Sequence, residues 1–319
     1  MSAAAAISVD RLVVNRSGRR VLDELTFDVS PGEIVGLIGP NGAGKTTTLA
    51  VLSTLLAPHA GEVRIAGHDL RRAPQAVRRS IGRVPQEVAL YPSLTGRENL
   101  VFFARLGGAR AAEARRVADA ALEQVGLAAR ADECAATYSG GMQRRLSLAC
   151  GLLGSPPVLL LDEPTVGVDP QSFESIVVAI RAHAKGGAAL LYSTHHMEEA
   201  EDLCDRVVLV DSGRVVATGP PTKLIREAVP GLLIDVVTDE TLPEGWLDGL
   251  AGTRACAPPD AGLSGMSRGR AARVALAEVE LAPRVLERAA RDRALLDFRV
   301  HRPSLHDAFL ALTGHAPRD

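Results

Sequence analysis

The stretch GPNGAGKTT occupies residues 39–47 and combines three glycines and one lysine with no acidic or aromatic side chain. Because glycine lacks a Cβ atom, such a loop can adopt positive φ angles and turn its backbone N–H groups inward. A concave set of amides of this kind binds anions. The apolar segment 34–38 predicts a buried strand before the loop, and residues 45–56 predict a helix whose N-terminus also favours an anion. The sequence therefore predicts a phosphate-binding loop between a strand and a helix.

The side chains of this loop indicate which groups would meet a bound nucleotide. Lys45 is placed to reach the β- and γ-phosphates, and the Thr46 hydroxyl is placed to hold Mg²⁺. A glycine-rich turn ahead of an ordinary helix is the simpler alternative, but the strand–loop–helix context favours phosphate binding. The other predicted nucleotide-binding residues of the loop are Gly39, Pro40, Asn41, Gly42, Ala43, Gly44 and Thr47.

Two acids follow a second apolar segment, which predicts a buried strand over residues 158–161. Ligands of open α/β sheets bind at the carboxyl ends of the strands, which places Asp162 near Thr46 as a group that orients Mg²⁺ through water. The next residue, Glu163, points elsewhere and is the candidate for polarising an attacking water molecule. An ordinary acidic turn is the alternative, and the upstream phosphate-binding loop argues against it.

A second loop of small residues lies at the start of the segment YSGGMQRRLSLACGLL, residues 138–153. Ser139, Gly140 and Gly141 precede a helical pattern, so this loop is a second potential phosphate cradle at a helix N-terminus. It carries no lysine or acid of its own. Taken alone, it would be an ordinary helix cap.

Composition bounds the class of protein. A chain of 319 residues suggests two domains, or one large domain with an appendage, and a hydrophobic content of 46% is ample for a core. The formal net charge of −2 provides no electrostatic case for a nucleic-acid partner. The four scattered cysteines are expected to be small buried side chains in a reducing compartment; they are Cys134, Cys150, Cys204 and Cys256.

No segment of the sequence predicts membrane insertion. The first six residues lack the basic region and the apolar core of a signal peptide. No uncharged apolar run approaches the length that spans a bilayer. We therefore expect a chain that is soluble by itself and that works on a membrane only through a separate partner.

The patterns predict an α/β fold in two domains. In the first, residues 1–219, an N-terminal antiparallel β piece is followed by the phosphate loop. A helical insert over about 95–154 precedes strands that are nearly all apolar, as a covered parallel sheet requires. Thr95 and Glu98 have the spacing of a capping box at the start of this insert.

The second predicted domain, residues 220–319, is small and α+β. Strands are expected at 233–237 and 272–279, and a helix at 282–296. Ser304 is expected to cap a last helix, with Asp307 at capping-box spacing.

The order of these motifs resembles that of the ATP-binding subunit of ABC transporters, and the resemblance covers residues from Val9 to about Gly219. The phosphate loop is followed by Gln86 after a strand, by the signature loop at 139–141, by Asp162 and Glu163, by Asp169, and by His195 after a further strand. The set is highly specific, although Gln86 and His195 taken singly would be a surface amide and an ordinary histidine at the end of a strand.

The resemblance implies a function and a set of partners. In that family, two copies dimerise head to tail, so that the Ser139–Gly141 loop of one closes over the ATP γ-phosphate held by the other. Gln86 is then expected to sense Mg²⁺ and to couple to an integral-membrane permease subunit. Asp169 is expected to shape the dimer contact and His195 to contact the γ-phosphate. Glu163 and His195 are the expected catalytic residues.

The sequence departs from the family pattern at three places. Tyr138 and Met142 stand where Leu and Gln are commoner, which is a mild change because Ser139 and both glycines remain. The first β segment has no aromatic residue to stack on adenine, and Arg16 is the best candidate to replace it.

The ending RPSLHDAFLALTG resembles the drug-export branch of the family, the daunorubicin-resistance type. We therefore expect a peripheral ATPase on the cytoplasmic face of a membrane that powers efflux of a drug-like or lipophilic substrate. A non-transport ABC ATPase in assembly or translation is the alternative, although the chain has one motif set and no strongly basic insert. A P-loop kinase or GTPase is disfavoured by the Ser139–Gly141 loop.

Overall fold

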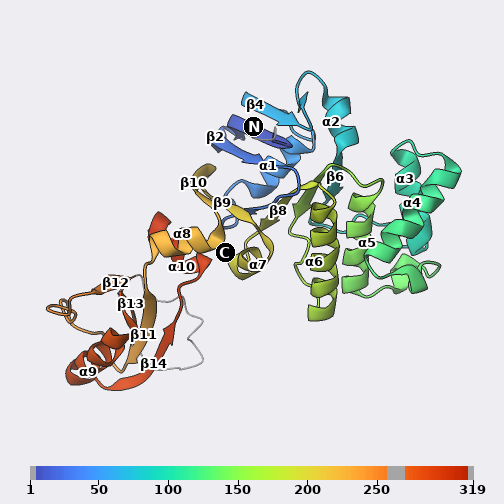
Figure 1. Cartoon of the computed structure of the whole chain (residues 1–319). Coiled ribbons are helices and arrows are strands. Elements are labelled where there is room, and N and C mark those ends of the chain that lie inside the picture. The colour runs from blue at the N-terminus through green and yellow to red at the C-terminus, as the bar shows by residue number, and fades with distance from the viewer. Residues whose placement is uncertain (1–4, 257–269, 315–319) are drawn as a thin grey trace. The chain divides into compact units, whose positions relative to one another are not determined.

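The computed structural model describes residues 5–256 and 270–314. The chain divides into two compact units on either side of the bond between Val215 and Val216. Figure 1 traces both units from the N-terminus in blue to the C-terminus in red. Each unit has its own sheet and its own apolar core, and the two are described separately below.

The first unit is built on a six-stranded sheet in the order β10-β9-β3-β8-β7-β6, and the boundary between the two units falls within its edge strand β10. The pairs β9–β3, β3–β8, β8–β7 and β7–β6 are all parallel. Every residue of β3, β7 and β8 is buried, as expected for a parallel sheet covered on both faces. Their carboxyl ends therefore meet at one edge of the sheet. The strands are β3 (Ile34–Ile38), β6 (Ile81–Val84), β7 (Val158–Asp162), β8 (Ala189–Thr194), β9 (Arg206–Asp211) and β10 (Arg214–Gly219).

Four helices connect the strands of this sheet: α1 (Lys45–Leu52), α2 (Pro74–Ser80), α6 (Pro170–Lys185) and α7 (Met197–Leu203). The helix predicted over 45–56 ends four residues early, at Leu52. Ser53 turns its hydroxyl back onto the Leu49 oxygen at 2.7 Å, and Thr54 adopts a left-handed φ of 60° that the helix cannot continue through.

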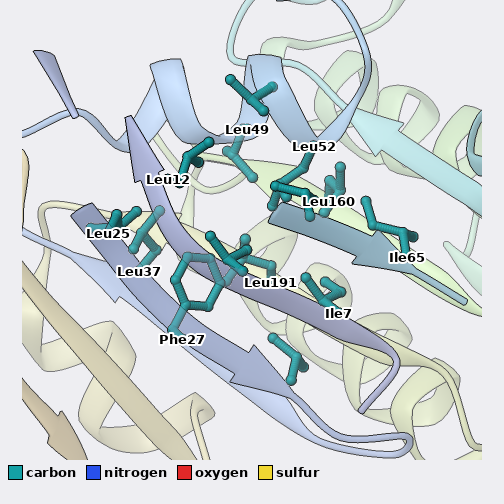
Figure 2. Close-up of a cluster of buried hydrophobic side chains, with 14 of the residues drawn as sticks. Ile7, Leu12, Leu25, Phe27, Leu37, Leu49, Leu52, Ile65, Leu160 and Leu191 are labelled. Carbon is teal, nitrogen blue, oxygen red and sulfur yellow. The ribbon is translucent and has the colours of Figure 1, made fainter. Parts of the chain in front are cut away.

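The predicted N-terminal β piece is a four-stranded antiparallel sheet in the order β2-β1-β4-β5. Its strands are β1 (Ile7–Arg16), β2 (Arg19–Val29), β4 (Ala60–Ile65) and β5 (His68–Asp69). Figure 2 shows apolar side chains of this sheet packed with others from the parallel sheet and from α1. The core of the first unit therefore lies between its two sheets, with α1 and the phosphate loop anchored on it.

The helical insert contains α3 (Gly96–Leu106), α4 (Ala111–Gln124) and α5 (Gly140–Leu152), with short 3₁₀ turns η1 (Ala128–Arg130) and η2 (Ala135–Thr137). The capping box predicted at its start is confirmed, since Thr95 and Glu98 each accept the other's backbone N–H. The expectation of four buried cysteines is wrong for Cys134, which is exposed on the connection between the two 3₁₀ turns. Cys204 is buried as expected, and the other two are half-buried.

The second unit is a four-stranded antiparallel sheet in the order β12-β13-β11-β14. The predicted strand 272–279 runs over 270–276, and the predicted helix 282–296 ends at Asp292. The reason is a strand, β14, that was not predicted and that begins at Leu295. The elements of the unit are α8 (Pro221–Ala228), β11 (Leu232–Thr238), β12 (Thr253–Cys256), β13 (Arg270–Leu276), η4 (Val279–Leu281), α9 (Ala282–Asp292), β14 (Leu295–His301) and α10 (Leu305–Thr313).

The last helix begins as predicted. Ser304 and Asp307 form a complete capping box. Asp307 also binds Arg273 of β13, which in turn holds Asp235 of β11 through two hydrogen bonds of 2.6 and 2.9 Å. These buried charges join α10 to the sheet and satisfy one another, which is the condition for burying them.

Candidate functional site

The phosphate loop is shaped by glycines that have no room for a side chain. Gly42 and Gly44 have φ angles of 81° and 103°, a region that other residues rarely adopt. A Cβ at Gly39 would overlap the Val210 oxygen of β9, and one at Gly44 would overlap Leu22 of β2. The loop is thus pressed between the two sheets, and its backbone can lie directly against a ligand.

Lys45 lies at the start of α1 and turns back into the loop. Its Nζ donates to the oxygens of Gly39 and Pro40 at 2.6 and 3.1 Å, and it lies 4.0 Å from Oε1 of Glu163. Burial lowers the pKa of Lys45, and the nearby carboxylates of Glu163 and Asp162 oppose that shift. The structure therefore places one buried cation at the mouth of the loop, beside an acid from another strand.

Asp162 ends β7 and meets groups from two other elements. Its Oδ1 accepts hydrogen bonds from Ser193 of β8 at 2.8 Å and from Thr46 at 3.4 Å. Burial raises the pKa of Asp162, while the hydrogen bond from Ser193 lowers it. A hydroxyl and a carboxylate are hard oxygen donors of the type that Mg²⁺ takes in phosphate sites, where it keeps several waters. The pair Thr46 and Asp162 therefore fits a magnesium ion.

Three of the predicted site residues, Lys45, Gln86 and His195, lie close to the carboxylate of Glu163. Its carboxylate accepts a hydrogen bond of 3.1 Å from Gln86, and its Oε1 lies 3.0 Å from Nδ1 of His195. The side chain is only 6% exposed. With Lys45 at 4.0 Å, three residues that lie between 32 and 118 positions away in the chain surround one carboxylate.

The backbone of Glu163 adopts an unusual conformation, with φ at 46° in the left-handed region. Such a conformation is costly for a residue with a side chain and persists only where the surroundings impose it. Here the N–H of Glu163 donates to the Ser193 oxygen at 3.1 Å. Beyond this turn the two carboxylates have different partners, Thr46 and Ser193 for Asp162, and Gln86 and His195 for Glu163.

The loop at residues 139–141 lies in different surroundings. Ser139 caps α5 by accepting the N–H of Met142 at 3.2 Å. A Cβ at Gly141 would overlap Asp169 and Ser172 at the start of α6. Asp169 itself caps α6, accepting the N–H and the hydroxyl of Ser172 at 2.9 and 2.8 Å. Among the described residues, no hydrogen bond joins this loop to residues 39–47 of the same chain.

Comparisons with known proteins agree with this geometry. The family model described as ABC transporter matches residues 22–166. The doxorubicin resistance ATP-binding protein DrrA of Mycobacterium tuberculosis is 41% identical over 304 residues, which cover 92% of this chain and 88% of that protein. A solved structure described as the ATP binding subunit of an ABC transporter is 34% identical, with a TM-score of 0.64, and covers 70% of this chain and 92% of that one.

The chain belongs to the ABC transporter family of ATP-binding subunits. The predicted family and fold class are thereby confirmed, and the ABC subunit is an ATPase that binds nucleotide. A further relative, the linearmycin resistance ATP-binding protein LnrL of Bacillus subtilis, is 35% identical over 301 residues, 94% of this chain and 96% of that protein. Within the described ranges 5–256 and 270–314, no helix of the ABC subunit is long and apolar enough to cross a membrane.

Arg144 lies at this site of the ABC subunit but was not predicted from the sequence. Arg144 lies on the buried face of α5 and is 5% exposed. Its guanidinium donates to the main-chain oxygens of Gln86 at 2.6 Å, Pro85 at 3.2 Å and Glu163 at 2.7 Å. Helical spacing could have predicted that Arg144 is buried, because it lies four residues before Leu148 and therefore on the same buried face of the helix. A guanidinium that binds three carbonyl oxygens joins α5 to the segments that carry Gln86 and Glu163.

The structure also explains how Tyr138 fits at the position where leucine is commoner in the signature. It is buried, and its hydroxyl donates to the Arg130 oxygen at 2.7 Å. A side chain at Gly96 would overlap the Tyr138 ring, so the tyrosine fills a place that glycine leaves open at the start of α3. Arg16, by contrast, is exposed at the end of β1, and no aromatic residue occurs over residues 14–18.

Proposed function

We propose that this ABC ATPase powers an exporter for a drug-like or lipophilic substrate, working with a separate integral-membrane permease on the cytoplasmic face of a membrane. The observation that carries the proposal is the convergence of Lys45, Gln86 and His195 on the Glu163 carboxylate, beside the phosphate loop. The relatives named for doxorubicin and linearmycin resistance cover nearly the whole chain, which favours export over a role in assembly or translation.

The chemistry follows from the positions of the side chains. Phosphoryl transfer to water depends almost entirely on positioning and on neutralising charge. Lys45 reaches the β- and γ-phosphates once it leaves the Gly39 and Pro40 oxygens. Glu163 orients the attacking water through its carboxylate, and His195, already 3.0 Å from that carboxylate, contacts the γ-phosphate. Each group comes from a different element, so all of them are in place only in the folded chain.

Magnesium completes the proposed site. When bound, the ion neutralises charge on the phosphate oxygens. Thr46, Asp162 and Gln86 are the residues that would hold it, the acid through water. Gln86 is exposed on the loop after β6 and already touches Glu163, so the same side chain is placed to link the ion, the acid and a docked partner.

The functional unit is proposed to be a head-to-tail dimer. The loop at 139–141 begins a helix of 13 residues, whose N-terminus attracts anions. Ser139 and Gly140 are exposed, and a side chain at Gly140 would meet nothing within 4 Å. Since this open loop makes no hydrogen bond to its own phosphate loop, a second copy is the natural source of the phosphate that it faces. Asp169 would act in the dimer from the start of α6, beside Gly141.

The permease is proposed to dock on the helical insert next to Gln86. A cavity of 870 Å³ lies between α2–β6 and α3–α4 and is lined by both basic and apolar side chains, including Arg79, Phe103 and Leu106. Tyr91 is 46% exposed and packs edge-to-face on Phe102, with ring centroids 4.8 Å apart. Tyr91 therefore packs against the insert and is also exposed to a partner.

Transport in membrane vesicles tests this function. The chain is produced together with the six-helix membrane protein encoded beside it, if there is one, and ATP-driven accumulation of doxorubicin is measured in inverted vesicles. The expected result is accumulation with the wild-type chain and none with Glu163→Gln, although both ATPases reach the membrane in equal amounts. ATP hydrolysis that no membrane partner stimulates, together with co-purification of ribosomal or assembly factors, would favour the non-transport alternative.

A further inference from the structure

The outer edge of the second unit carries an exposed apolar row. β14 is an edge strand: among the described residues it pairs with β11 on one side and with no strand on the other. Phe298 and Val300 alternate along it and are 49% and 38% exposed, and Leu296, which is 54% exposed, lies at a bulge where Leu295 is the partner of Thr238. Proteins usually blunt such edges, because the free row of backbone groups invites another strand.

β14 carries one acidic and one basic residue, on either side of Phe298. Asp297 and Arg299 flank Phe298 and face the opposite side of the sheet, as the alternation of a strand requires. Asp297 accepts the neighbouring N–H of Phe298 at 2.8 Å. The backbone of Arg299 pairs with Asp235 of β11, but its exposed side chain forms no hydrogen bond or ion pair with any residue in the described part of the chain. An acid, a central aromatic and a base therefore follow one another, with an apolar residue beyond each charge.

We propose that β14 pairs antiparallel with β14 of a second copy of this chain, about a two-fold axis through Phe298. In that register, Asp297 faces Arg299 of the second copy and Arg299 faces its Asp297. On the other side of the sheet the two Phe298 rings meet at the axis, and the bulge at Leu296 ends the regular pairing beyond the two charges. Opposite charges and apolar pairs that face each other directly stabilise strand pairing. The two four-stranded sheets become one continuous sheet of eight strands.

The registers next to this one are unfavourable. An axis through Asp297 places two carboxylates opposite each other, and an axis through Arg299 places two guanidinium groups opposite each other. If one strand slips by a single residue along the other, charged side chains lie opposite apolar ones on the wrong face of the sheet. The two charges of β14 are thus complementary about Phe298, as a two-fold interface requires. This property identifies the occupant as a second copy.

The pairing goes beyond the proposed function and does not rest on it. It gives the C-terminal unit a role in holding two ATPases together without nucleotide, whereas the head-to-tail dimer depends on bound ATP. The two associations can therefore be tested apart.

Charge reversal tests the pairing in the full-length chain without nucleotide. Asp297→Arg and Arg299→Asp each place like charges opposite each other at two symmetric positions, and each is expected to weaken self-association about tenfold or more. The double variant Asp297→Arg/Arg299→Asp restores opposite charges and should recover wild-type association. Sedimentation equilibrium measures all four proteins, and circular dichroism with thermal melts, which should not change, confirms that the second unit of each is folded. A wild-type chain that stays monomeric, or a double variant that associates no better than the single ones, would overturn the proposal.

Disulfide formation tests the register independently. Phe298→Cys places two thiols opposite each other, with Cβ atoms about 4.5–5.5 Å apart. Leu296→Cys is the matched control, because in this register its thiols lie roughly 13 Å apart along the strands. Both are made in a Cys134→Ser chain, since Cys134 is an exposed thiol. Fast dimer formation by the first variant alone is expected. Equal rates for both, or cross-linking of the first only to a different protein, would show that β14 does not pair with its own copy in this way.

Discussion

The guanidinium of Arg144 donates a hydrogen bond of 2.7 Å to the main-chain oxygen of Glu163. The same side chain donates at 2.6 Å to the oxygen of Gln86, whose amide contacts the Glu163 carboxylate. One buried residue of α5 thus fixes both the backbone and a side-chain neighbour of the proposed catalytic acid. Arg144 therefore connects the helix that begins at the signature loop with the residue proposed as the catalytic acid.

Arg144→Gln should therefore lower kcat more than it lowers nucleotide affinity. Glutamine has too few donors to reach all three oxygens, so the left-handed turn at Glu163 loses its restraint. Misplacement of a catalytic group by about 1 Å costs up to roughly a hundredfold in rate. Arg145→Gln is the matched control, because Arg145 donates to Val125 at 3.2 Å, on another side of the helix. Steady-state kinetics with thermal melts would contradict the assignment if both variants lost activity equally, or if stability alone changed.

Glu163→Gln should nearly abolish hydrolysis and preserve ATP binding. The substitution keeps the shape of the side chain but removes the carboxylate that orients water, and a general base contributes roughly 10²- to 10⁴-fold in rate. The protein should then persist as an ATP-bound dimer on size-exclusion chromatography. Turnover is measured at saturating ATP with the permease present, and a near-normal rate there would exclude Glu163 as the catalytic base.

Lys45→Ala should weaken ATP binding itself. The substitution removes the one side-chain charge aimed at the β- and γ-phosphates, and hydrogen bonds to charged groups contribute about 1.5–3 kcal/mol. A loss of roughly tenfold or more in affinity is therefore expected from calorimetry. The glycines that shape the loop remain, so the protein should still fold; unchanged affinity in a folded variant would contradict the role given to this loop.

Tyr91→Glu should uncouple transport from ATP hydrolysis. Tyr91 lies beside the Phe102 ring on an exposed part of the insert, far in sequence from the phosphate loop. A charge there disfavours an apolar partner contact, while the basal ATPase of the isolated chain should survive. Transport in vesicles and ATP turnover are compared in the same preparation. Intact transport in this variant would place the permease contact elsewhere.

Selectivity for the base should be weak, so GTP should be hydrolysed at a rate comparable to ATP. No aromatic residue occurs over 14–18, and exposed Arg16 is the best candidate to stack on the base. Loss of a rigid ring forfeits on the order of 1 kcal/mol of stacking, which discriminates little between adenine and guanine.

Variants at Arg16 separate its two roles. If the guanidinium stacks, Arg16→Ala lowers the affinity for both nucleotides, and if it is only a solvated turn residue, the affinity stays the same. Arg16→Tyr should tighten both. Strict preference for ATP in a competition assay would show that another group reads the base.

Much of this protein was determined by local sequence. The phosphate loop, the apolar parallel strands and the two capping boxes each depend on residues a few positions apart, so their signals are complete within short segments. The helix that was predicted to run through Leu296 failed for the opposite reason. Residues 295–301 become a strand because they pair with β11, some 60 residues earlier, and that pairing overrides the local helical pattern.

In the candidate site too, some features follow from the local sequence and others only from the tertiary structure. The sequence supplied the identity of Lys45, Gln86, Glu163 and His195, but not that one carboxylate contacts the other three, because the closest of these contacts in sequence spans 32 positions. Nor did it decide which of two adjacent arginines turns inward. Arg144 is buried and Arg145 is not, because Arg144 meets the loops that follow β6 and β7, whereas Arg145 reaches the Val125 oxygen at the end of α4. The local sequence determines the residue types and the turns. Residues far apart in the chain come into contact only when the sheet has formed.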